Sequence, residues 1–129
     1  MKRCDTTVAW AALHGHFEAH GRAFDLREAF ARDAERVQGL TWGAPEIHAD
    51  LSKNLIDTAT LRFLHDLARE CGVEAHRDAM FAGEPINATE GRAVLHTALR
   101  APRGAGPFSD EVHGVLDAMF AYAERVRDT

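Results

Sequence analysis

The chain has 129 residues, of which 46% are hydrophobic and 27% charged, and its formal net charge is −5. This length supports one domain with a modest core, and the composition is typical of a folded globular protein. The acidic balance and the scattered Lys and Arg residues argue against a nucleic-acid partner, and no apolar run approaches the length that spans a membrane.

The two cysteines, Cys4 and Cys71, are far apart and belong to no short motif. Isolated cysteines of this kind are more typical of free thiols in a reducing compartment than of a disulfide framework. Residues 1–5 include Lys2 and Arg3, but no apolar signal region stands behind them, so no secretory signal is predicted. The sequence therefore favours a cytoplasmic protein.

The first third of the chain predicts two helices. The first has a cap at Thr6 or Thr7, continues to about His20 and ends at Gly21. One face of it carries Trp10, Leu13, His14 and Phe17. A short second helix follows Asp25 and places Leu26, Ala29 and Phe30 inward.

A change of hydrophobic period then predicts a small β-hairpin. Apolar residues alternate on both sides of Gly43-Ala44-Pro45, which is expected to form the tip of the hairpin. These residues are Val37, Leu40 and Trp42 before the turn, and Ile47, Ala49 and Leu51 after it. An isolated hairpin is marginal in water, so this element is expected to pack on something larger.

The remainder of the chain predicts four more helices. Asp57 caps the first, which ends at Gly72, and a shorter helix over residues 73–83 buries Met80 and Phe81.

Thr89 is the predicted cap of a further helix over Glu90–Arg100, and the loop 101–107 follows it. Ser109 caps the last helix, whose apolar stripe is Val112, Val115, Leu116, Met119, Ala123 and Val126. The expected fold class is mostly α with one small β-hairpin.

Four segments carry a more particular signal: Asp50–Asn54 (DLSKN), Ala79–Glu84 (AMFAGE), Ile86–Arg100 (INATEGRAVLHTALR) and Glu111–Asp117 (EVHGVLD). In this order they closely resemble the glucose-6-phosphate isomerase (phosphoglucose isomerase) family, whose segments read DYSKN, AMFxGEKIN, IN-x-TE-x-RAVLH-x-ALR and EVxxVLxxM. The resemblance runs from about Val8 to Arg127. Leu51 stands where that family usually has Tyr, and the loop after Arg100 is shorter than in many members.

The resemblance implies that residues 1–129 are a single N-terminal segment of a larger, two-domain α/β enzyme of the sugar-isomerase type, without its downstream domains. The parent enzyme would interconvert glucose 6-phosphate and fructose 6-phosphate in glycolysis and gluconeogenesis. It would be a cytoplasmic homodimer that uses no metal or organic cofactor. The family's catalytic groups lie in later segments, so this piece alone is expected to be inactive. The alternative is a stand-alone, non-catalytic helical interaction module.

Arg92 and His96 are the strongest candidate site residues. They are four residues apart and would share one face of the predicted helix. A His moves protons near neutral pH and an Arg can hold a phosphate, which are both needs of aldose–ketose isomerisation. Because the resemblance places the catalytic groups later in the chain, no catalytic or substrate-binding residue is assigned here. The two residues are expected to support groups that contact the substrate.

Three other patterns have simpler explanations. His16 and His20 are one helical turn apart and His14 is near, but no third ligand completes a metal site, so a solvated histidine-rich helix end is favoured. Asn87-Ala88-Thr89 matches a glycosylation acceptor, yet a helix cap explains Thr89 better. Lys53 could bind an anion, but a turn satisfied by Ser52 and Asn54 is favoured.

Overall fold

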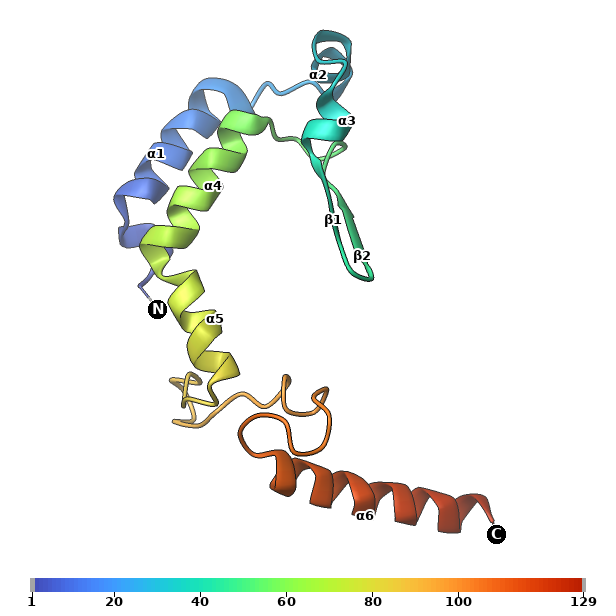
Figure 1. Ribbon diagram of the computed structural model, residues 1–129. Coiled ribbons are helices and arrows are strands. Elements are labelled where there is room, and N and C mark those ends of the chain that lie inside the picture. The colour runs from blue at the N-terminus through green and yellow to red at the C-terminus, as the bar shows by residue number, and fades with distance from the viewer. Residues whose placement is uncertain (1, 129) are drawn as a thin grey trace. The chain divides into compact units, whose positions relative to one another are not determined.

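The computed structural model describes residues 2–128 and is mostly helical with one two-stranded antiparallel sheet, which confirms the predicted fold class (Figure 1). The chain divides into two compact units, Met1–Val73 and Glu74–Thr129. Among the described residues, no helix is both long and apolar enough to cross a membrane.

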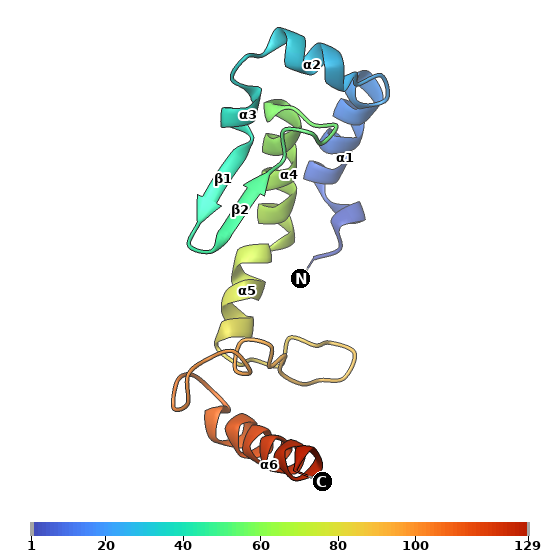
Figure 2. The same ribbon diagram turned by 90° about the vertical axis from the view of Figure 1, so that its right-hand side faces the viewer.

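In the first unit, α1 (Val8–His16) and α4 (Thr58–Cys71) lie side by side (Figures 1 and 2). Thr7 caps α1, because its side chain accepts a hydrogen bond from the Trp10 N–H. A short 3₁₀ turn, Cys4–Thr6, precedes the helix, and a π-helical turn, Phe17–Gly21, continues it. The first predicted helix therefore has the expected limits, although its last turn is wider than an α-helix.

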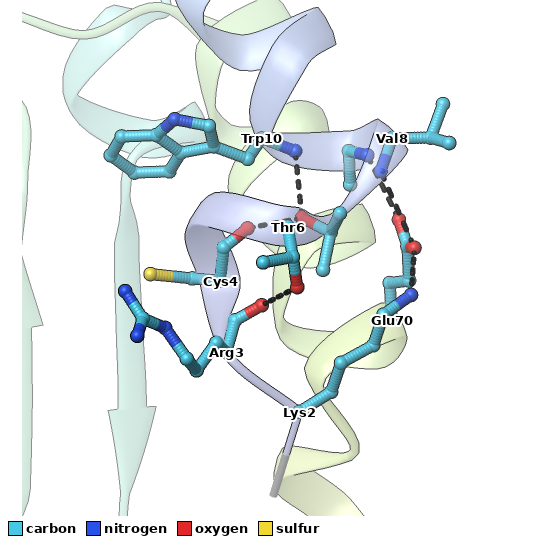
Figure 3. A network of polar contacts seen from close by, with 9 residues as sticks. Lys2, Arg3, Cys4, Thr6, Val8, Trp10 and Glu70 are labelled. Atoms are coloured by element: carbon cyan, nitrogen blue, oxygen red, sulfur yellow. Dashed lines mark hydrogen bonds and ion pairs between the residues drawn. The ribbon is translucent and has the colours of Figure 1, made fainter.

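Glu70 of α4 holds the start of α1 in place (Figure 3). Its carboxylate accepts hydrogen bonds from the backbone N–H of Val8 (3.3 Å) and of Ala9 (2.8 Å) and from Lys2 Nζ (2.7 Å). The Lys2 ammonium and then the Ala9 N–H lower the pKa of Glu70. A carboxylate at this position satisfies free amides of the first helical turn and faces the positive end of the helix dipole.

Both ends of α4 are closed as the sequence predicts. Gly72 follows the helix in the left-handed conformation, with φ of 75°. At the other end, Asp57 accepts hydrogen bonds from the Thr60 N–H (2.7 Å) and hydroxyl (2.8 Å). Burial raises the pKa of Asp57, but the two Thr60 bonds and the nearby His16 outweigh burial, so the pKa of this carboxyl is lowered.

Two short helices, α2 (Leu26–Arg32) and α3 (Arg36–Gly39), lead into the hairpin. The Asp25 side chain caps α2 by accepting from the Arg27 and Glu28 N–H groups, so the predicted helix does follow Asp25. Val37 lies in α3 and not in the strand that the alternating pattern predicted.

The hairpin pairs β1 (Thr41–Ala44) with β2 (Ile47–Asp50), so Pro45 and Glu46 form its tip. The predicted tip, Gly43-Ala44-Pro45, was placed too early, because Gly43 and Ala44 pair with residues of β2. Proline at the first turn position is pre-set for a tight turn, and Glu46 completes it with a left-handed φ of 69°.

Arg36, the first residue of α3, is only 3% exposed and is buried against backbone carbonyls. Its Nε donates to the Ser52 carbonyl oxygen (2.8 Å). One terminal nitrogen donates to the carbonyl oxygens of Asn54 (2.9 Å) and Ile56 (2.8 Å). A single guanidinium therefore holds the whole connection between β2 and α4.

Two aromatic rings complete the surroundings of Arg36. Its guanidinium carbon lies 5.6 Å from the centroid of Phe24 and 5.5 Å from that of Phe30. Arginine is less strongly hydrated than lysine and stacks on aromatic faces, so it tolerates this burial. Phe30 was predicted to face inward, but the residue is 38% exposed even though its ring lies beside the guanidinium.

In the second unit, α6 (Ser109–Arg127) is the longest helix, and α5 (Val73–Phe81) bridges the boundary between the units. The prediction that Ser109 caps α6 is wrong. The cap position belongs to Phe108, in a left-handed conformation with φ of 61°, while Ser109 Oγ accepts from the Gly104 N–H at 2.7 Å. The burial predicted for Phe81 is also wrong, because this last residue of α5 is 58% exposed.

We expect Arg36→Lys to lower the free energy of unfolding by about 2–4 kcal/mol. A lysine ammonium can satisfy one or two of the three carbonyls, and each buried group left without a partner costs roughly 1–3 kcal/mol. Denaturant unfolding followed by circular dichroism measures the loss. The matched control is Arg32→Lys, whose exposed side chain pairs with Glu28 and whose loss should be below about 0.5 kcal/mol. Equal losses in the two variants would contradict the role of Arg36.

The lowered pKa of Asp57 leads us to expect that the stability of the fold decreases in acid. Because its pKa in the folded state lies below the ordinary value of 3.8, its ionised form stabilises the fold above about pH 4, and this contribution disappears as pH falls through the lowered pKa. Asp57→Asn keeps a capping oxygen and should remove this part of the pH dependence, whereas Asp57→Ala should cost about 1–2 kcal/mol at pH 7. Thermal melts from pH 7 to pH 2 test both. Unaltered acid sensitivity in the Asn variant would assign it to another group.

Candidate functional site

The segment Ile86–Arg100, with its strong resemblance to a sugar-phosphate isomerase, does not form the predicted helix over Glu90–Arg100. Asn87 Oδ1 accepts hydrogen bonds from the N–H groups of Thr89 and Glu90, each at 3.2 Å. The Gly91 N–H donates to the Asn87 carbonyl at 2.7 Å, with φ of 65° at Gly91. The chain therefore reverses tightly, and Asn87 pairs with Arg92 in an isolated antiparallel bridge.

After this reversal the chain winds through separate turns. The Leu99 N–H donates to the Leu95 carbonyl and the Ala101 N–H donates to the Thr97 carbonyl, both at 3.0 Å, but no continuous helix forms. Ala98 is 6% exposed and lines a hollow of about 180 Å³ beside Phe81 and Pro107. Thr89 caps no helix, and the predicted loop over 101–107 is confirmed.

Arg92 and His96 consequently share no helix face. The Arg92 guanidinium pairs with the Glu90 carboxylate, and the Arg92 side chain is 72% exposed. His96 is exposed, and its backbone carbonyl accepts from the Arg100 guanidinium at 2.9 Å. The expected geometric link between these two residues is absent from the described segment, because it depended on the helix.

The Asp50–Asn54 segment is a compact turn, as favoured from the sequence, but other groups build it. Asp50 Oδ1 accepts from the Ser52 N–H (2.8 Å), and Asp50 Oδ2 accepts from Lys53 Nζ (2.9 Å). The Ser52 hydroxyl, the Lys53 ammonium and the Ser52 N–H lower the pKa of Asp50. Lys53 is thus an exposed cation whose charge is partly neutralised by Asp50 of the same turn. Arg36 binds the Ser52 carbonyl oxygen of this turn.

A hollow of about 270 Å³ in the first unit lies where α1 and the π-helical turn meet Leu55 and the start of α4. Its lining residues are Trp10, Leu13, His14, His16, Phe17, Gly21, Leu55 and Thr60. The apolar face predicted for the first helix supplies four of these side chains. The hollow is mainly apolar, and its polar groups come from the histidines and Thr60.

His16 is the least exposed of the three histidines, with a side chain 11% exposed. Its Nε2 lies 2.9 Å from Thr60 Oγ1, and its ring packs on Phe63 with centroids 4.9 Å apart. Because the only hydroxyl proton of Thr60 goes to Asp57, His16 Nε2 must be the donor to Thr60. The prediction of a solvated histidine cluster is therefore wrong for His16, which ties the π-helical turn to the start of α4.

These arrangements favour structure over catalysis. The Thr60 hydroxyl points its proton at a carboxylate that is already used as a helix cap, so His16 does not activate it as a nucleophile. Within residues 2–128, no group of three or more His, Cys, Asp or Glu side chains is placed to hold a metal ion. A further hollow of about 470 Å³ in the first unit is lined by several charged side chains, including His20, Asp25, Glu28, Arg32, Asp33, Arg36 and Asp57. Its carboxylates already have structural partners: Asp25 and Asp57 cap helices, Glu28 pairs with Arg32 and Asp33 accepts from the Glu35 N–H.

Sequence reasoning missed the residues that organise these segments, namely Arg36, Thr60 and Glu70. Arg36 and Glu70 act across 16 or more positions of sequence, and no short-range pattern marks them. The role of Thr60 could have been predicted from the sequence. A capping residue such as Asp57 is often followed, three residues later, by a side chain that hydrogen-bonds back to it.

Comparison with known proteins identifies the wider family. The family model described as Phosphoglucose isomerase matches residues 50–129. The glucose-6-phosphate isomerase of Leptothrix cholodnii is 66% identical over 127 residues, covering 98% of this chain and 23% of the relative. The proteins of the same name from Methylibium petroleiphilum and Deinococcus radiodurans are 61% and 49% identical, again over 98% of this chain and 23% and 24% of the relatives.

The chain thus spans about a quarter of the length of the curated relatives that it matches. The family match covers the Asp50–Asn54 turn, the Asn87–Arg92 reversal and α6, which are the segments that carried the resemblance. The chain belongs to the phosphoglucose isomerase family.

Proposed function

We propose that this chain is an N-terminal segment of a glucose-6-phosphate isomerase, the enzyme that interconverts glucose 6-phosphate and fructose 6-phosphate in glycolysis and gluconeogenesis. The observation that supports this most strongly is the 66% identity to a protein of that name across 98% of the chain. Residues 1–129 act together as one segment, and the sugar-isomerase domains of the enzyme are supplied by further polypeptide.

The role of the segment is to support the catalytic body. Its hydrogen bonds join helix ends and turns to one another, as Glu70 does for α1 and Arg36 does for the Asp50–Asn54 turn. The sugar phosphate is bound by the whole enzyme, which works as a cytoplasmic homodimer without a metal or organic cofactor. The unpaired thiols of Cys4 and Cys71 agree with a reducing compartment.

Arg92 and His96 are proposed to position groups that touch the substrate. Two observations support this role: both residues lie in the segment that most resembles the family, and both side chains are exposed in the described chain. Exposure leaves them free to meet neighbours that the complete enzyme supplies.

The second candidate function is a stand-alone, non-catalytic helical interaction module. One observation favours it: α6 exposes a row of large apolar side chains that could bind another protein. The enzymatic segment remains the main proposal, because an exposed apolar face is also what a piece of a larger domain presents.

The purified chain alone should show no isomerase turnover above a heat-treated control in a coupled assay with fructose 6-phosphate. Isomerisation needs ring opening, proton transfer between C1 and C2 and a phosphate clamp, and the carboxylates that line the hollow of about 470 Å³ are already used as helix caps, in a turn or in an ion pair. A chimera, in which this chain replaces the matching segment of a glucose-6-phosphate isomerase, should turn over the same substrate. Activity of the chain alone, or a folded but inactive chimera, would contradict the proposal.

In that chimera, Arg92→Ala should lower kcat by less than about tenfold, which corresponds to roughly 1.4 kcal/mol of barrier, with little change in KM. A positioning residue acts through its neighbours, so Arg92→Lys should recover part of the loss. In the isolated chain the same substitution should cost below about 1 kcal/mol of stability, because the pair with Glu90 is exposed. Steady-state kinetics and denaturant unfolding measure both. A loss of several orders of magnitude in kcat would make Arg92 a catalytic residue.

A further inference from the structure

We draw no further inference here: the strongest candidate, the mainly apolar hollow of about 270 Å³ where α1 and the π-helical turn meet Leu55 and the start of α4, carries none because nothing in the structure shows what covers it.

Discussion

The buried guanidinium of Arg36 is the contact on which the first unit depends. One side chain binds three carbonyl oxygens of the connection between β2 and α4, and two phenylalanine rings cover it. A two-stranded hairpin is marginal by itself, and Arg36 holds the chain that directly follows its second strand. It also fixes the Asp50–Asn54 turn, where the family match begins. Removing one hydrogen-bonding group would therefore loosen the hairpin and the turn together.

The described chain closes little of its own core. Leu40, Cys71, Ala98 and Val112 are its buried apolar residues, whereas many larger side chains remain exposed on α5 and α6. Polar contacts such as the Glu70 carboxylate at the start of α1 do much of the joining. Such contacts orient elements well but contribute less stability than apolar burial. This balance is what a segment shaped by a larger protein is expected to show.

Features fixed by neighbouring residues were predictable from the sequence. The caps at Thr7 and Asp57 and the stop at Gly72 need only a few residues, and all three are confirmed. The fold class followed from the same signals. The helix expected over Glu90–Arg100 failed because apolar spacing was given more weight than the turn signals of Asn87 and Gly91, whose hydrogen bonds reverse the chain.

That failure also explains why the candidate site could not be predicted. The prediction placed Arg92 and His96 side by side only because it placed both on one helix. In the structure the Arg92 guanidinium forms an exposed ion pair with Glu90 instead. Family resemblance preserves residue identities that serve the whole enzyme, and it does not reveal the local conformation of a segment. The segment most similar to the family can therefore lie in irregular structure, with the Arg92 and His96 side chains exposed.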